Sequence, residues 1–91
     1  MSTYTQEDEL LLEDVVTVEE SRLVIYNDDV NTFDHVIDSL ISVCGHDPLQ
    51  AEQCTLIIHY KGKCEVKMGN YDKLEPMCVA LHDRGLSAEI Q

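Results

Sequence analysis

Three side chains rich in hydrogen-bond acceptors, Asn27, Asp28 and Asp29, stand together between an apolar segment and a helix-like pattern. Asn and Asp side chains commonly bond to nearby backbone amides, so the ordinary interpretation of this triplet is a turn. Two carboxylates and an amide can also bind a small cation such as an ammonium group, because an ammonium donates several hydrogen bonds. The triplet alone is compatible with both interpretations, and the turn is the commoner one.

The sequence contains no recognisable catalytic constellation. It has no Ser or Cys beside a base motif, no glycine-rich phosphate loop, and no paired acids with a separate oxyanion donor. His59 has an unusual place, at the end of an amphipathic segment just before Tyr60. A histidine there is commonly a solvated group that complements the helix dipole, although it can also be a ligand. These features predict a binding protein and not an enzyme.

The four cysteines do not follow the spacing of a metal site. Cys44, Cys54, Cys64 and Cys78 contain no Cys-x-x-Cys pair, and none stands beside a His at zinc spacing. Free cysteines on apolar positions behave as small hydrophobic residues in a reducing compartment. We therefore expect buried free thiols, no metal ion and no cofactor.

Charge is distributed unevenly along the 91 residues. The net charge is −12, and seven of the 18 acidic residues precede the first basic residue, Arg22. This pattern predicts an acidic flexible arm over residues 1–21, with an apolar cluster at residues 10–12, and a folded domain over residues 22–91. A polyanion repels nucleic acid and anionic lipid, and no apolar run approaches the roughly 18 residues of a membrane span. Without a secretion or transit signal, we expect a cytoplasmic protein with no nucleic-acid or membrane partner.

Hydrophobic spacing predicts the elements on both sides of the triplet. Residues 22–27 are typical of a strand that ends at the triplet. Apolar residues then recur at helical spacing from Phe33 to Cys44, with a cap expected at Thr32 or Asn31. Gly45 suits the left-handed position that follows a helix.

A second helix is predicted to begin at Asp47 as the N-cap, with Pro48 at its first position, and to reach His59 and Tyr60 before Gly62. Residues 64–68 alternate between apolar and charged side chains, as a half-buried strand does.

A third helix is predicted after this strand, with Asn70 or Asp72 as its cap and Gly85 at its end. Pro76 is expected in its first turns, where a missing amide costs little. Residues 86–90 then form a last short strand. The resulting β-α-α-β-α-β order predicts an α+β fold, a two-layer α/β sandwich whose three-stranded sheet is covered by three helices.

Two stretches together resemble the ClpS family, the adaptors that bring N-degron substrates to a Clp AAA+ unfoldase and its protease. They are residues 23–29 with the helix of residues 33–44, and residues 55–63, which include His59-Tyr60-Lys61-Gly62-Lys63. The resemblance covers residues 22–91 and implies the same element order. It also implies binding of a free α-amino group and a bulky first side chain (Leu, Phe, Tyr or Trp), and docking on the N-terminal domain of a Clp unfoldase.

The resemblance assigns roles to single residues. Asn27, Asp29 and His59 match the direct ligands of the α-amino group, and Asp28 adds negative potential. The residues that match the walls and mouth of the side-chain pocket are Ile25, Asn31, Phe33, Val36, Thr55, Ile58 and Leu86. Asp72 matches an acidic contact to the unfoldase.

The sequence departs from the family pattern at three pocket positions and at one docking position. Phe33 and Thr55 stand where a Met is frequent, Asn31 replaces a frequent Thr, and Met77 replaces a basic docking residue. The resemblance therefore does not rank the first residues or identify the unfoldase.

Two other interpretations are compatible with the sequence. A similar small sandwich forms the C-terminal domain of the ribosomal stalk protein, a non-proteolytic interaction domain. A metal or enzyme site could use Asp28, Asp29, His35 and His59, but His35 lies off the apolar stripe and is expected to point to solvent. The adaptor is favoured if Asn27, Asp29 and His59 surround one cavity, and the stalk-like domain if they are scattered.

Overall fold

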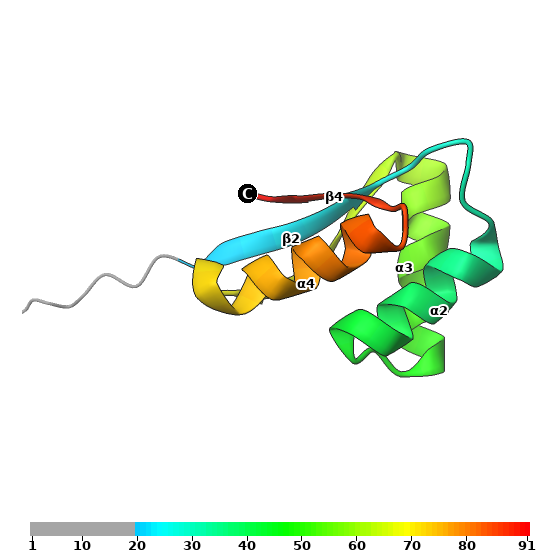
Figure 1. Ribbon diagram of the computed structural model, residues 1–91. Coiled ribbons are helices and arrows are strands. Elements are labelled where there is room, and N and C mark those ends of the chain that lie inside the picture. Colours follow the sequence, from blue (N-terminus) through cyan, green and yellow to red (C-terminus); the bar gives the residue numbers. More distant parts are fainter. Residues whose placement is uncertain (1–19) are drawn as a thin grey trace, which may run out of the picture.

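The computed structural model describes residues 20–91, and these confirm the predicted α+β sandwich with β-α-α-β-α-β order. The elements are β2 (Ser21–Tyr26), α2 (Phe33–Cys44), α3 (Pro48–Lys61), β3 (Lys63–Gly69), α4 (Tyr71–Asp83) and β4 (Ser87–Ile90). The helices lie on one side of the sheet, with α4 alongside β2 and β4 and the α2–α3 pair at the far end (Figure 1). Most of the predicted arm, including residues 10–12, lies outside the described residues, whereas its last residue, Ser21, already belongs to β2.

The strand order is β3-β2-β4, and both neighbours of the central strand are antiparallel to it. Tyr26 at the end of β2 pairs with Lys63 at the start of β3 and with Ser87 at the start of β4. The triplet that follows Tyr26 therefore leaves the sheet where α3 ends and where β4 begins. This register explains how residues far apart in the chain meet at one corner of the domain.

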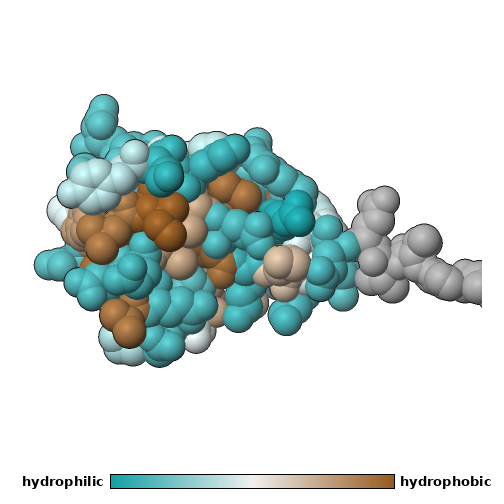
Figure 2. Space-filling model, turned by 180° about the vertical axis from the view of Figure 1, so that it is seen from behind, coloured by the Kyte–Doolittle hydropathy of each residue, from teal (hydrophilic) through white to brown (hydrophobic). Residues whose placement is uncertain are grey.

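Side chains of alternating residues of β2 form the centre of the core, since successive residues of a strand face opposite sides of the sheet. Leu23 and Ile25 are buried, and so are the helix residues that pack against them, Leu40, Leu74 and Leu81. Seen from behind the view of Figure 1, the surface of the molecule is mostly hydrophilic, and hydrophobic residues gather toward the end that holds α2 and α3 (Figure 2). Within residues 20–91, no helix combines the length and the apolar character of a membrane span.

All four cysteines are free, as predicted. Cys44 and Cys78 are buried, whereas Cys54 and Cys64 are only half-buried. Burial raises the pKa of the Cys44 thiol to about 11 and that of Cys64 to about 12. The thiolate form that reacts is therefore scarce at these two positions at neutral pH.

Each helix begins at a polar cap. Thr32 Oγ1 accepts a hydrogen bond from the His35 amide, and Asp47 and Asn70 each accept one from the amide three residues later. Of the alternatives that the sequence left open, the caps are Thr32 and not Asn31, and Asn70 and not Asp72. With Asn70 as the cap, Pro76 is the sixth residue of α4, within its first two turns as predicted. It lies past the amides at the start of a helix that have no helical partner, so its ring removes one helical hydrogen bond.

The end of α4 is a tight turn that requires glycine. The Leu86 amide donates to the Leu81 carbonyl at 3.0 Å, and the Gly85 amide donates to the His82 carbonyl at 2.9 Å. This is the Schellman pattern, in which the residue after the cap adopts a left-handed conformation. Gly85 has a φ of 84° and fills that position.

A Gly85→Ala substitution is expected to destabilise the domain by about 1–2 kcal/mol, because a side chain disfavours the left-handed region. An added Cβ would meet nothing closer than Asn31 Oδ1 at 3.9 Å, so backbone strain is the main effect. Urea denaturation measures the change. Gly69→Ala is the control, since Gly69 has no positive φ and the atom nearest its added Cβ, at 3.2 Å, belongs to the flexible Lys73 side chain. Equal stability of the two variants would contradict the assignment.

Candidate functional site

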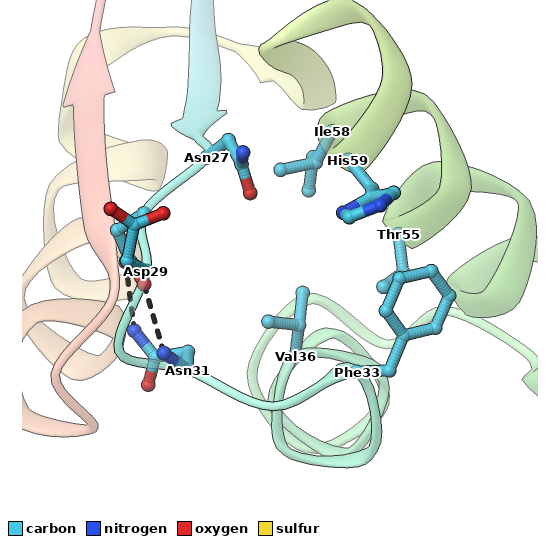
Figure 3. A pocket seen from close by; sticks show the side chains of 9 residues that line it. Asn27, Asp29, Asn31, Phe33, Val36, Thr55, Ile58 and His59 are labelled. Atoms are coloured by element: carbon cyan, nitrogen blue, oxygen red, sulfur yellow. Dashed lines mark hydrogen bonds between the residues drawn. The ribbon is translucent and has the colours of Figure 1, made fainter.

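Nine of the twelve predicted site residues line one cavity beside the end of β2. The backbone N–H of Asn27 donates a hydrogen bond to the backbone carbonyl of Gly62 at 2.9 Å, which joins the triplet to the end of α3. The cavity has a volume of about 280 Å³ and opens between the triplet, the start of α2 and the last turns of α3. Its lining residues are Asn27, Asp28, Asp29, Asn31, Phe33, Val36, Thr55, Ile58 and His59 (Figure 3).

Three hydrogen-bond acceptors at this cavity have no partner. Asn27, Asp29 and His59 are exposed, and within the described residues their side chains make no hydrogen bond. Figure 3 shows the Asn27 amide oxygen directed toward the cavity from the end of β2, with His59 on α3 and Asp29 on the loop at opposite sides of it. The site therefore offers an amide oxygen, a carboxylate and a ring nitrogen to one small group.

Asp28 has a different role from its two neighbours. Its Oδ1 accepts hydrogen bonds from the backbone amides of Val30 and Asn31, both at 2.9 Å, and its Oδ2 accepts one from Asn31 Nδ2 at 2.8 Å. The turn interpretation therefore holds for Asp28, whereas the acceptors of Asn27 and Asp29 are available to a ligand. Asp28 lines the cavity, but most of its acceptor capacity is used within the loop.

These hydrogen bonds favour the charged form of the Asp28 carboxylate. The hydrogen bond from the backbone amide of Asn31 is the main cause that lowers the pKa of Asp28 below its ordinary value. The hydrogen bonds from the Val30 backbone and from the Asn31 side chain lower it further, whereas burial raises it. Because the folded-state pKa is lowered, this carboxylate stabilises the fold above its unfolded pKa. The contribution is lost only as the pH falls through the lowered value.

The apolar part of the cavity comes from α2 and α3. Val36 and Ile58 are buried, and Thr55 is buried with its hydroxyl donating to the Ala51 carbonyl at 2.8 Å. Phe33 stands at the mouth with 39% of its surface exposed. Its ring meets that of His59 edge-on at 5.5 Å between centroids.

Two predicted wall residues do not line this cavity. Ile25 and Leu86 line a smaller adjoining cavity of about 20 Å³, which shares Val36 and Ile58 with the main one. Their side chains are almost fully buried, so they support the wall from behind. Asp72 is remote from both cavities, in the first turn of α4.

His35 does not point freely to solvent, and that prediction was wrong. Its Nε2 lies 2.8 Å from the Arg84 carbonyl oxygen in a partly buried contact. Residues off the apolar stripe of α2 can still meet the turn between α4 and β4, which helical spacing alone does not reveal. Within residues 20–91, no three His, Cys, Asp or Glu side chains are arranged to hold a metal ion.

Comparison with known proteins agrees with this geometry. The family described as ATP-dependent Clp protease adaptor protein ClpS matches residues 17–89. The chain belongs to the ClpS family. The resemblance drawn from residues 22–91 is thus confirmed, and the family is one of adaptors of an ATP-dependent protease.

Individual relatives carry the same family name. The ClpS adapter protein of Corynebacterium aurimucosum is 31% identical over 86 residues, covering 92% of this chain and 78% of the relative. That of Corynebacterium efficiens is 32% identical over 82 residues, covering 86% and 81%. The solved structure of Agrobacterium tumefaciens ClpS2 bound to L-phenylalaninamide superposes with a TM-score of 0.79 at 17% identity, over 82% of this chain and 98% of that one, which supports the ClpS fold.

Proposed function

We propose that this ClpS family member binds N-degron substrates through the free α-amino group and the bulky apolar first side chain, and delivers them to a Clp AAA+ unfoldase for proteolysis. One observation carries the proposal: Asn27, Asp29 and His59, whose side-chain acceptors have no partner among residues 20–91, line one cavity with apolar walls. A ribosomal stalk-like interaction domain has no need for that arrangement. The Agrobacterium relative was solved with L-phenylalaninamide, which supports a ligand of this class.

The acceptor set suits an α-ammonium group. An ammonium has three N–H donors in a tetrahedral fan, so acceptors from several directions can bind it together. Each charge-assisted hydrogen bond contributes about 1.5–3 kcal/mol. An acetylated terminus has lost both the charge and two of the donors, which leaves the acceptors of the site unpaired.

The cavity suits a single side chain. Its volume of about 280 Å³ lies just below the range of roughly 300–1,000 Å³ that is common for small-molecule pockets. Burial of a Leu- or Phe-sized side chain adds about 1.5–3 kcal/mol. Together with the ammonium contacts, these contributions are consistent with micromolar affinity, about −8 kcal/mol.

A series of peptides that differ only in the first residue tests this pocket. Peptides that begin with Leu, Phe, Tyr or Trp are expected to bind, and those that begin with Val or Ile to bind more weakly, because a branch at Cβ crowds the entrance beside Phe33. Fluorescence anisotropy with the free-amine peptides gives the order. Equal affinity for a Gly-initiated peptide would contradict the pocket assignment.

We further propose that the protein acts in the cytoplasm and docks on the N-terminal domain of the unfoldase through a surface that includes Asp72. The net charge of −12 opposes binding to nucleic acid or anionic lipid. Asp72 lies in the first turn of α4, apart from the peptide site, so the protein could hold a substrate and its unfoldase at once.

Removal of residues 1–20 is expected to leave peptide affinity nearly unchanged and to abolish delivery. Among residues 20–91, those that line the cavity all lie at position 27 or beyond, and the field of the seven acidic residues is screened over about 8 Å at physiological salt. Peptide binding and degradation by the cognate unfoldase–protease are measured on the same preparation. Lost affinity, or unimpaired degradation, would contradict this division of labour.

A further inference from the structure

The loop that carries the acceptors is attached to a segment far along the chain, the turn between α4 and β4. Asn31 Nδ2 donates a hydrogen bond to the Gly85 carbonyl at 2.9 Å. His35, in the first turn of α2, approaches the Arg84 carbonyl at 2.8 Å through Nε2. A carbonyl oxygen only accepts, so His35 Nε2 carries the hydrogen in this bond. Two donors from the site side thus bind two successive carbonyls of the turn.

The Asn31 amide group also reaches inward to the triplet. The same nitrogen donates to Asp28 Oδ2 at 2.8 Å, so both of its hydrogens are engaged (Figure 3). Asp28 in turn accepts from the backbone amides of Val30 and Asn31. A continuous chain of hydrogen bonds therefore runs from Gly85 through Asn31 to Asp28, the residue between Asn27 and Asp29.

The turn at the outer end of this chain is firmly held. The residues on either side of it, Leu81 and Leu86, are buried, and their backbones are joined by the hydrogen bond that closes the turn. Arg84 Nη1 donates to Asp38 Oδ2 at 3.1 Å and lies 3.5 Å from Ser39 Oγ, both on α2. The turn is thus fixed to the core and to α2, and can serve as an anchor for the loop.

We infer that Asn31 is a positioning residue, which transmits the fixed position of the α4–β4 turn to Asp28 and so holds the acceptors of Asn27 and Asp29 at the spacing that an α-ammonium requires. The inference rests on the proposed function and gives Asn31 a role other than pocket wall. A hydroxyl residue at this position has one hydrogen and could donate to Gly85 or to Asp28, but not to both. The amide of Asn31 serves both at once.

The test compares two peptides that begin with Leu, identical except that one is N-acetylated, against variants of the full chain. Asn31→Leu keeps a similar size and removes both donors. We expect it to lower the ratio of free-amine to acetyl affinity at least tenfold, because misplaced acceptors weaken the ammonium contacts, which the acetylated peptide does not make. Asn31→Thr retains one donor and is expected to give an intermediate ratio.

Asn70→Ala is the matched control, since Asn70 caps α4 and contributes to stability without lining the cavity. It is expected to lower the urea midpoint and leave the ratio unchanged. An unchanged ratio in the Asn31 variants, or an equal loss of affinity for both peptides, overturns the inference, the latter in favour of a wall role. If Asn31→Leu does not fold, the ratio in Asn31→Thr decides alone. A parent protein that binds both peptides equally defeats the proposed function itself, a result distinct from any of these.

Discussion

An Asp29→Asn variant is expected to bind a peptide with a free N-terminal Leu about 10- to 100-fold more weakly than the parent protein. The Asp29 carboxylate has no hydrogen-bond partner within residues 20–91 and stands at the rim of the cavity. Loss of its charge turns a charge-assisted hydrogen bond into an ordinary one and leaves the ammonium less compensated. Titration of the labelled peptide by fluorescence anisotropy measures the change.

Asp34→Asn is the matched control for this effect. Asp34 lies in the first turn of α2, close to the site in sequence, but does not line the cavity. It removes the same charge, so it reports the loss of long-range attraction alone, which screening reduces over about 8 Å. Similar losses in the two variants would show that the acidic surface, and not contact with Asp29, accounts for ammonium binding.

A His59→Ala variant is expected to bind about tenfold more weakly at neutral pH and to lose most of the acid-side decline in affinity that the parent shows. Neutral imidazole accepts a hydrogen bond from the ammonium, whereas the protonated ring has no acceptor and carries a like charge. Affinity of the parent should therefore fall on acidification if His59 is the acceptor. Binding curves at several pH values give both quantities.

His82→Ala is the control for the pH series, since His82 is exposed near the end of α4 and lines neither cavity. The lowered pKa of Asp28 keeps its carboxylate charged over this series, so melting of the loop is not expected to contribute. A His59→Ala protein that retained the full acid-side decline would assign it to another group.

The helices and strands were predictable because the spacing of apolar residues and the capping or glycine residues at their ends define each of them locally. The apolar repeat from Phe33 to Cys44 and the left-handed Gly45 define α2 without any tertiary information. The sequence predicted a single cap for α3, Asp47, but left two candidates for α4, since Asn70 and Asp72 are equally suited by type. In the structure Asn70, directly after β3, makes the capping bond.

The residues of the site were predictable as a set because two motifs, around Asn27 and around His59, belong together in the ClpS family. Their division of roles was not. Asp28 and Asp29 are adjacent and chemically identical, and only the loop geometry shows that the first is bound within the turn. The contacts of Asn31 with Gly85 and of His35 with Arg84 join residues 54 and 49 positions apart, and no local pattern encodes such pairs.

The most direct test of ammonium recognition is the affinity of the parent protein for a Leu-initiated peptide with and without N-terminal acetylation, measured by isothermal titration calorimetry at neutral pH. Acetylation removes the positive charge and two donors while it leaves the first side chain intact. We predict that the free peptide binds at micromolar or better affinity and that the acetylated peptide binds at least 100-fold more weakly. Equal affinity for the two peptides would contradict the assignment of Asn27, Asp29 and His59 to the α-amino group.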